Sequence, residues 1–376
     1  MNSPSSEITL PPHLRPSDGR FGSGPSKVRA EALAALAAAA PTYLGTSHRQ
    51  SPVRSMVGRL RAGMTELFAL PEGYEVVLGN GGAACFWDVA LFSLIERRSQ
   101  HLSFGNFSES FATMAANAAH LDTPDIIESP AGTHPEANPN PDVDAYCLTH
   151  NETSTGVAME VVRPAPAEQG LVLVDATSAA GGMRVDPSEF DVYYFSPQKG
   201  FGADGGLWIA LCSPAALARV DTVKATGRWI PESLNLATAI ENARLDQTYN
   251  TPGLATLFLM ADQLEWILAN GGLEWAASRC EESTNILYGW AEKSDFATPY
   301  VAAPADRSPV VATIDLADSI DAKAVNKVLR ANGIVDTEPY HRLGRNQLRV
   351  SVYPSVEPDD VTVLTGAIDH VVAALS

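Results

Sequence analysis

Charged residues are scarce in this sequence, and basic residues are scarcer than acidic ones. Only 19% of the 376 residues are charged, and 26 Lys and Arg against 44 Asp and Glu give a formal net charge of −18. An acidic protein is repelled by phosphate backbones and by anionic membrane surfaces. We therefore expect neither nucleic acid nor a membrane as a partner. The hydrophobic content of 45% predicts instead a folded chain with a large core.

Long apolar runs and paired cysteines are also missing. The longest apolar stretch, residues 32–40, is far shorter than the ~20 residues that a membrane span needs. The N-terminal residues lack the basic-then-apolar pattern of a secretion signal. The four cysteines are scattered without C-x-x-C spacing, so we expect reduced thiols and no metal site. These features predict a soluble, cytoplasmic protein.

Lysine occurs only six times, and one lysine has an unusual context. Lys199 lies in F-S-P-Q-K-G-F-G (195–202), directly after an apolar, aromatic run that is typical of a buried strand. Burial disfavours an ammonium group, so the pKa of this amine is expected to fall, and a neutral amine can form a Schiff base with an aldehyde. The other five lysines lie in polar or amphipathic segments. Lys199 is therefore a candidate covalent anchor, with a structural lysine as the alternative.

Asp175 is the candidate partner of that lysine. It ends G-L-V-L-V-D (170–175), a continuous apolar run typical of a central parallel strand buried on both faces. Ligands of open α/β sheets collect at the carboxyl ends of the strands. A carboxylate there can keep a pyridine nitrogen protonated, as in pyridoxal phosphate (PLP) sites. The alternative is an N-cap for a helix that begins near Ser178.

The order of the expected elements predicts an α/β protein. Strand-like runs are separated mostly by helical or long connections, the pattern of a doubly wound, mainly parallel sheet. The short connection 198–206 predicts one antiparallel strand. We expect a loose N-terminal arm (1–20), a three-layer α/β/α large domain with a mainly parallel sheet (21–270) and a small α+β C-terminal domain (271–376).

The expected elements have these approximate positions. Helices are predicted at 26–40, 85–95 and 254–270, and a surface loop at 123–142. Strands are predicted at 76–79, 102–105, 145–149, 172–175, 192–195, 207–211, 310–316 and 348–353.

Two glycine-rich segments are candidates for phosphate binding. G-F-G-A-D-G (200–205) matches G-x-G-x-x-G, but a strand follows it where a nucleotide-binding fold has a helix. G-N-G-G-A-A (79–84) follows a strand and opens a helix, so the backbone N–H groups of Ala83 and Ala84 would face a phosphate. A simple tight turn remains the alternative for this second segment.

Other polar and aromatic residues follow predicted strands. In T-H-N-E-T-S-T-G (149–156), Thr153 could bond a ring hydroxyl, with a plain polar loop as the alternative. Phe107 in S-F-G-N-F-S (103–108) could stack on a planar cofactor, although a lone aromatic is more often part of a core.

Histidine–arginine pairs occur twice, at His48–Arg49 and at His341–Arg342. Arginine binds carboxylate and phosphate with two parallel hydrogen bonds, so these pairs are candidates for an anionic small molecule. Solvated surface charge is the alternative. It explains the neighbouring Arg345 well and Arg349 poorly, because Arg349 opens an alternating strand.

Together these motifs resemble the phosphoserine aminotransferases, a branch of the class V, fold type I PLP enzymes. The resemblance covers nearly the whole chain beyond about residue 20. It rests on S-H-R (47–49), G-G-A (81–83), the T-H-N-E-T segment, an aspartate 199 − 175 = 24 residues before the Q-K-x-x-G lysine, N-T-P (250–252) and the late H-R followed by an arginine. Three positions depart from the family: Phe107 replaces the usual tryptophan, Ala84 a frequent arginine, and T-H-N the usual T-S-N.

The resemblance implies roles for these residues. Lys199 would carry PLP, Asp175 would pair with its ring nitrogen, and Arg349 would hold the substrate α-carboxylate. The other implied cofactor ligands are Ala83, Ala84, Phe107, Thr153 and Gln198, with Asn250 and Thr251 from the second subunit of a homodimer. The implied ligands of the distal phosphate or carboxylate are His48, Arg49, His341 and Arg342.

The implied reaction is amino transfer between glutamate and 3-phosphohydroxypyruvate, giving O-phospho-L-serine for serine biosynthesis. A phosphorylated intermediate of vitamin B6 synthesis is an alternative second substrate. Another class V enzyme, an alanine– or serine–glyoxylate aminotransferase or a cysteine desulfurase, is the alternative function. A desulfurase needs a cysteine on a mobile loop, whereas the last cysteine, Cys280, lies in a helix-like segment.

Overall fold

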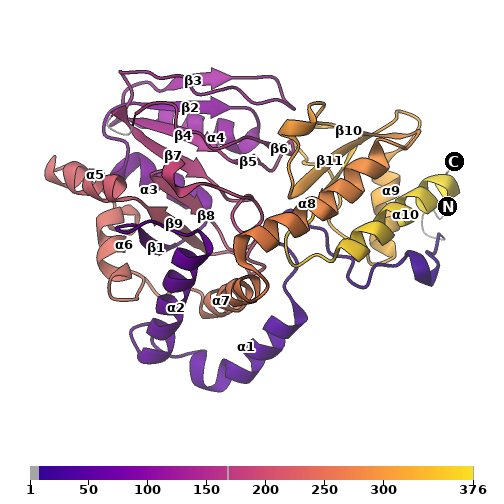
Figure 1. The fold of residues 1–376 in the computed structure, drawn as a ribbon, viewed down its shortest axis with the longest axis horizontal. Helices are drawn as coiled ribbons and strands as arrows, with labels where there is room; N and C mark the ends of the chain where they lie inside the picture. The colour runs from indigo at the N-terminus through magenta and orange to yellow at the C-terminus, as the bar shows by residue number, and fades with distance from the viewer. Residues whose placement is uncertain (1–7, 167–168, 376) are drawn as a thin grey trace.

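The computed structural model describes residues 8–166 and 169–375 (Figure 1). The larger part of the molecule is built on a seven-stranded sheet of order β1-β9-β8-β7-β4-β2-β3. Its strands are β1 (Glu75–Asn80), β2 (Ser99–Ser103), β3 (Asp125–Glu128), β4 (Ala145–Thr149), β7 (Leu171–Asp175), β8 (Val192–Phe195) and β9 (Leu207–Cys212). A separate two-stranded ribbon joins β5 (Asn151–Glu152) to β6 (Val157–Ala158).

Helices cover both faces of the large sheet, which confirms the predicted α/β fold. The first face packs against α1 (Ala30–Tyr43), α2 (Ser51–Leu67) and α7 (Leu254–Ala269), and the second against α3 (Ala83–Ser93), α4 (Asn106–Ala116), α5 (Pro214–Ala225) and α6 (Leu236–Ala243). Val172 and Val174 of β7 point into the first core, and Leu171 and Leu173 into the second. Burial on both faces is therefore the reason why this strand is a continuous apolar run.

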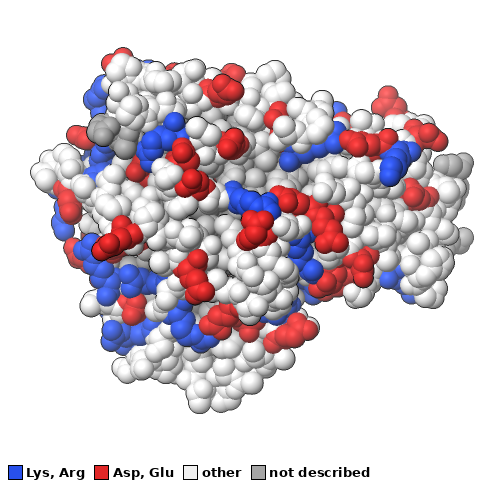
Figure 2. All heavy atoms as spheres, in the orientation of Figure 1, with Lys and Arg blue, Asp and Glu red and all other residues white. Residues whose placement is uncertain are grey.

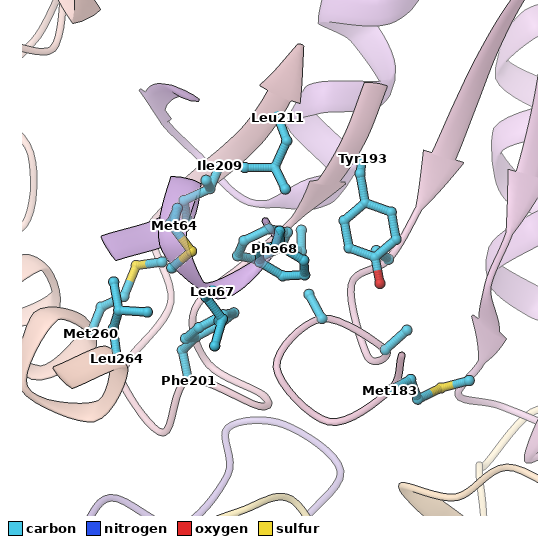
Figure 3. Close-up of a cluster of buried hydrophobic side chains, with 14 of the residues drawn as sticks. Met64, Leu67, Phe68, Met183, Tyr193, Phe201, Ile209, Leu211, Met260 and Leu264 are labelled. Atoms are coloured by element: carbon cyan, nitrogen blue, oxygen red, sulfur yellow. The ribbon is translucent and has the colours of Figure 1, made fainter. Parts of the chain in front are cut away.

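Figure 3 shows the first core from within. Met64 and Phe68 at the end of α2 lie against Tyr193 of β8 and Ile209 of β9, and Met260 of α7 closes the cluster. Long and aromatic side chains fill the space between the helices and the pleated sheet, and this packing holds the strand ends in fixed positions.

Strand direction decides where the loops lie. β9 is antiparallel to both of its neighbours, β8 and β1, and the remaining pairs of the large sheet are parallel. The predicted antiparallel strand is thereby confirmed. Because β9 alone is reversed, the other six strands of this sheet, β1, β2, β3, β4, β7 and β8, all end at the same edge.

The smaller part is an antiparallel sheet covered by helices. Leu287 of α8 (Gly272–Ala291) packs on it, as do the apolar faces of α9 (Ala322–Ala331) and α10 (Pro358–Leu375). Cys280, also in α8, belongs to the large core. α7 ends at Ala269 and α8 begins at Gly272, but α8 contributes to both cores, so the domain division at residue 270 stays a prediction. The elements are α8 (Gly272–Ala291), β10 (Ala297–Pro299), β11 (Val311–Leu316), α9 (Ala322–Ala331), β12 (Gln347–Ser351) and α10 (Pro358–Leu375). Short 3₁₀ turns are η2 (Pro12–Leu14), η4 (Pro187–Glu189), η5 (Glu232–Leu234) and η6 (Pro304–Asp306).

The N-terminal segment differs from the expectation. Residues 8–20 are not a loose arm, because Leu10 is buried in the core of the small part and the Ser17 amide donates to Asp360 at 2.6 Å. Residues 1–7 of the predicted arm lie outside the described residues. The first helix starts at Ala30 instead of Ser26, since Ser26 donates its hydroxyl to the Lys199 carbonyl oxygen at 2.6 Å.

Two other predictions also differ from the structure: one segment expected to be a loop contains a strand, and the first helix ends later than expected. The segment 123–142, expected to be a surface loop, contains β3 at the open edge of the sheet, paired with β2 in parallel. The first helix passes Pro41 and ends at Tyr43. Both features lie on partly exposed surface, where apolar periodicity is a weak signal.

The surface carries both signs of charge. On the face shown in Figure 2, basic and acidic side chains are interspersed. Within residues 8–166 and 169–375, no helix combines the length and the apolar character that a membrane span requires.

Candidate active site

A cavity of about 520 Å³ opens at the edge where the six parallel strands end. The loops that follow β1, β2, β4, β7 and β8 line it, as expected for an open α/β sheet. Eight of the residues predicted from the sequence lie in its wall: Ala83, Ala84, Phe107, Thr153, Asp175, Gln198, Lys199 and Arg342.

Lys199 lies on the loop that follows β8, and only 9% of it is exposed. Its Nζ donates a hydrogen bond to the carbonyl oxygen of Ser23 at 2.7 Å. Burial lowers the pKa of the amine to about 8, the charge of Arg349 acts in the same direction, and Asp175 and Glu152 oppose the shift. Roughly a tenth of this amine is therefore neutral at pH 7, and about half at pH 8.

Asp175 is buried at the end of β7 and surrounded by donors. Its Oδ2 accepts from the indole N–H of Trp87 at 2.8 Å, and its Oδ1 accepts from the amide of Thr177 at 2.9 Å and from the hydroxyl of Thr177 at 2.5 Å. Burial raises the pKa of Asp175, and the hydrogen bonds from Thr177 and Trp87 oppose that rise. These bonds favour the charged form of the carboxylate, which can then bind a protonated ring nitrogen.

The turn after β1 leads into α3, and its residues Gly82, Ala83 and Ala84 line the cavity. The Ala83 amide at the start of α3 donates to the hydroxyl of Ser196 at 2.6 Å. Gly81 has φ +122°, and a Cβ added there would lie 2.6 Å from the Cβ of Cys85. This glycine therefore permits the tight approach of the turn to the helix.

Two amide side chains in the cavity wall have spare hydrogen-bonding capacity. Asn151 Oδ1 and Gln198 Oε1 are buried and have no partner among the described residues. Thr153 lies beside Asn151, and both bond the hydroxyl of Ser178 at 2.8 Å. Buried polar groups are normally paired, so these oxygens indicate a polar ligand.

Arg342 and Arg349 approach the cavity from the small part. Arg342 Nη1 donates to Asn106 Oδ1 at 2.9 Å and lines the cavity. Arg349 Nη1 donates to the carbonyl oxygen of Thr153 at 3.2 Å, and burial lowers the pKa of its guanidinium. Arg349 Nε is buried without a partner in the part of the chain that the structure describes.

The remaining predicted residues lie outside the cavity wall. His48 Nδ1 is 3.0 Å from the Thr251 hydroxyl, and Arg49 donates to Gln247 at 2.8 Å. Asn250 lines a separate pocket of about 90 Å³. His341 is exposed and packs on the ring of Tyr340. The chain's own fold thus brings eight predicted residues together, joins Arg349 to them through Thr153, and leaves His48, Arg49, Asn250, Thr251 and His341 apart.

Comparison with known proteins decides the family. The profile of the aminotransferase class-V family matches residues 130–364. A putative phosphoserine aminotransferase of Mycolicibacterium vanbaalenii is 58% identical, over 98% of this chain and 99% of the relative. The phosphoserine aminotransferase of Nocardioides sp. is also 58% identical, over 97% and 98%. The chain belongs to the class-V aminotransferases, with the phosphoserine aminotransferases.

The fold agrees with this assignment. The crystal structure of a phosphoserine aminotransferase from Cytophaga hutchinsonii superposes with a TM-score of 0.84, 23% identity, and coverage of 94% of this chain and 99% of that one. At that identity the likeness concerns the fold alone. The predictions of a class-V, PLP-dependent aminotransferase and of a three-layer α/β/α fold are confirmed.

Several residues around the aminotransferase cavity were missed by the sequence analysis. Trp87 and Ser196 line it and bond to predicted site residues. Trp87 lies in an apolar helix 88 residues before Asp175, so the sequence carried no local signal for it. Ser196 directly follows the strand that leads to Lys199, and its position at a strand end was an available signal.

Proposed function

We propose that this protein is a cytoplasmic, homodimeric phosphoserine aminotransferase that transfers an amino group between glutamate and 3-phosphohydroxypyruvate. One observation carries the proposal. A buried lysine with a lowered pKa shares a cavity with a buried aspartate, and arginines from the small part approach the same cavity. Relatives at 58% identity that are named phosphoserine aminotransferases support it.

The residues of the cavity fit PLP. Lys199 would hold the aldehyde carbon, Asp175 the ring nitrogen and Thr153 the ring oxygen, while Phe107 would contact the face of the ring. Ala83, Ala84 and Gln198 would hold the phosphate. The unpaired oxygens of Asn151 and Gln198 are the observation that supports a polar ligand here. When bound, PLP accepts the electrons of the substrate's α-carbon–hydrogen bond.

Lys199 is the proposed proton carrier. A general base works best when its pKa lies near the operating pH, and the pKa of Lys199 is about 8. In the first half-reaction its amine takes the proton from the α-carbon of the amino donor. In the second half-reaction it delivers a proton to the α-carbon of the amino acid that forms. Asp175, held by Trp87 and Thr177, keeps its negative charge toward the ring nitrogen throughout.

Substrate recognition follows from the charges at the cavity. Arg349 would bind the α-carboxylate that all amino-acid substrates share. Arg342 lies at the cavity wall and is exposed, so it can reach the distal carboxylate of glutamate or the phosphate of 3-phosphohydroxypyruvate. A guanidinium serves both groups because it presents paired donors to either oxyanion.

A second subunit would supply the remaining ligands. If Asn250 and Thr251 reach the cavity of the partner, His48 would also lie there, because it contacts Thr251. Arg49 would lie there too, because it donates to Gln247, close to Asn250 in the sequence. Arg342 and Arg49 of one distal pocket would then belong to different subunits. Exposed apolar side chains support such an interface: Leu33 of α1 is 47% exposed, and Leu44 and Tyr249, close in sequence to His48 and Asn250, are also exposed.

The function is tested with purified protein, glutamate and a panel of ketoacids. We expect 3-phosphohydroxypyruvate to give the highest kcat/KM, and pyruvate, glyoxylate and oxaloacetate much lower values. Faster reaction with glyoxylate than with the phosphorylated ketoacid would overturn the proposal. The dimer is tested by sedimentation across protein concentrations, with PLP absorbance followed at each. Cofactor loss should track dissociation, and a fully active monomer would contradict the shared site.

A further inference from the structure

Glu152 is a fully buried carboxylate beside the cavity, with 0% of the residue exposed. Five N–H and O–H groups surround it. Its Oε2 lies 3.1 Å from the Phe107 amide, 2.9 Å from the Ser108 amide and 3.0 Å from the Ser108 hydroxyl. Its Oε1 lies 3.1 Å from the Ser154 amide and 2.6 Å from the Ser154 hydroxyl. Burial raises the pKa of Glu152, and these hydrogen bonds oppose the rise.

This carboxylate caps α4 from a distant segment. The first amides of a helix lack partners within the helix, and the residue before α4 is Gly105, which has no side chain to supply one. Glu152 accepts from two of these amides, and the positive end of the helix dipole favours its charge. A Cβ on Gly105 would lie 2.3 Å from Glu152 Cγ, so the glycine leaves the room that the carboxylate occupies.

The cap has consequences for the cavity. Phe107 and Asn106, the first residues of α4, line it, and so does Thr153, the residue after Glu152. The Asn106 amide donates to the Ser154 hydroxyl at 3.0 Å, and Ser154 is itself held by Glu152. The start of α4 and the loop that carries Thr153 and Ser154 are therefore fixed to each other through the side chain of Glu152.

The same network reaches both arginines from the small part. Arg342 donates to the side-chain oxygen of Asn106, and Arg349 donates to the backbone oxygen of Thr153. We propose that Glu152 is a positioning residue that fixes the ring-facing Phe107 and the two substrate arginines relative to Lys199. This inference rests on the proposed function for its substrates but not for its cofactor.

The charge of Glu152 also reaches Lys199. It favours the ammonium form and thus raises the pKa of that lysine, against the dominant effect of burial. A neutral side chain at this position should let the pKa of Lys199 fall further. An uncharged cap would not have this effect, so the titration of Lys199 reports the charge of Glu152 separately from its hydrogen bonds to α4.

The test compares Glu152→Gln with Glu109→Gln. Both remove one carboxylate from the first turn region of α4, but Glu109 is exposed and lies outside the cavity wall. Both oxygens of Glu152 accept hydrogen bonds, whereas a glutamine has only one oxygen. Its NH₂ group would face N–H donors and leave them without an acceptor. We expect PLP affinity, measured by absorbance titration, to fall about tenfold in Glu152→Gln, since a buried N–H donor at the start of α4 is left unpaired. Glu109→Gln should stay within about twofold of the wild type.

The second readout uses the chain without cofactor. Reductive methylation over a pH series, quantified on the peptide that contains Lys199, gives the midpoint of its titration. The midpoint should move to lower pH in Glu152→Gln and stay in place in Glu109→Gln. Unchanged PLP affinity together with an unchanged midpoint would overturn the inference.

A third variant covers the case in which Glu152→Gln does not fold. Ser154→Ala keeps the charge and removes the hydroxyl that joins Glu152 to Asn106. It should raise the KM for both substrates and leave the Lys199 midpoint unchanged, and wild-type KM values would overturn the inference. If the wild type fails to use 3-phosphohydroxypyruvate, the proposed function fails, whereas the PLP and Lys199 readouts still decide the role of Glu152.

Discussion

The cavity around Lys199 and the basic cluster of His48 and Arg49 are built in different ways. The cavity residues follow the ends of five strands, and cores on both faces of the sheet fix those ends. His48 and Arg49 lie on a connection between α1 and α2, where Arg49 is exposed. The comparison teaches that one chain brings Lys199 and Asp175 together by itself, whereas the proposed distal recognition depends on surface loops that a second subunit would complete. Changes in the two regions should therefore have different effects.

The largest effect is expected inside the cavity, at Lys199→Ala. This change removes the proposed covalent anchor and the proton carrier together, so transamination should fall by at least about a thousandfold. The measurement is kcat with glutamate and 3-phosphohydroxypyruvate at saturating PLP. Lys27→Ala, a partly buried lysine outside the cavity wall, is the control and should stay near the wild-type value. Substantial activity in Lys199→Ala would mean that another residue moves the proton.

Arginine variants sharpen the comparison between the two regions. Arg342→Leu and Arg49→Leu should lower kcat/KM for the phosphorylated ketoacid by about 30-fold or more, since a lost charged hydrogen bond in a closed site costs about 2–5 kcal/mol. The loss for 2-oxoglutarate should be smaller because a phosphate carries more charge than a carboxylate. PLP occupancy should not change.

Arg349→Leu should instead lower kcat/KM equally for both substrates, because each carries an α-carboxylate. Arg345→Leu is the matched control, since Arg345 pairs with Asp315 and lies outside the cavity wall. Equal losses of kcat/KM for both ketoacids in Arg342→Leu, Arg49→Leu and Arg349→Leu would show that the residues of the distal pocket are wrongly assigned.

A smaller effect is expected at Trp87→Phe. The change removes one of the donors to Asp175 and keeps an aromatic ring in the core. A hydrogen bond to a charged group contributes about 1.5–3 kcal/mol, so kcat should fall about tenfold or more. The pKa of Asp175 should rise, and activity should be lost at a higher pH on the acid side, because the charged carboxylate is the active form.

Trp290→Phe provides the control for that change. Trp290 also donates its indole N–H to an aspartate, Asp369, but in the small part and at the surface. It should leave the pH profile unchanged. A profile for Trp87→Phe that matches the wild type would rule out an electrostatic role for Trp87.

The smallest effect concerns the stability of the cofactor-free chain. The pKa of Lys199 is about 8 in the folded chain against an ordinary value of 10.5. The unfolded chain then binds more protons between these two values, so stability rises with pH in that window and the buried ammonium destabilises the fold below it. Melting temperatures of the wild type relative to Lys199→Met should therefore rise from about pH 8 to about pH 10.5. A difference that does not change with pH would contradict the lowered pKa.

The sequence predicted the residues that line the cavity better than the residues that hold them in place through hydrogen bonds. Asp175 and Lys199 follow apolar runs that end at the same edge of the sheet, and this rule needs no knowledge of distant contacts. Trp87 and Glu152 were missed because their partners lie 88 and 45 residues away. A tryptophan in an apolar helix and a glutamate in a polar loop carry no local sign of such bonds.

The segments predicted least well lie at edges and ends. Residues 8–20 pack through a single buried Leu10 and through the bonds of Ser17 to Asp360, which a polar, proline-bearing composition does not reveal. β3 is half exposed and pairs only with β2 in the large sheet. The positions of His48 and Thr251 relative to a partner's cavity depend on a second chain, and they stay a prediction.

Borohydride reduction of the PLP-loaded protein tests the central claim most directly. Reduction fixes the cofactor to the amine that holds it, and peptide mapping by mass spectrometry then identifies the residue. The cavity around Lys199 predicts a pyridoxyl label on Lys199, in the peptide that contains residues 195–202. A label on any of the other five lysines of the sequence would contradict the account.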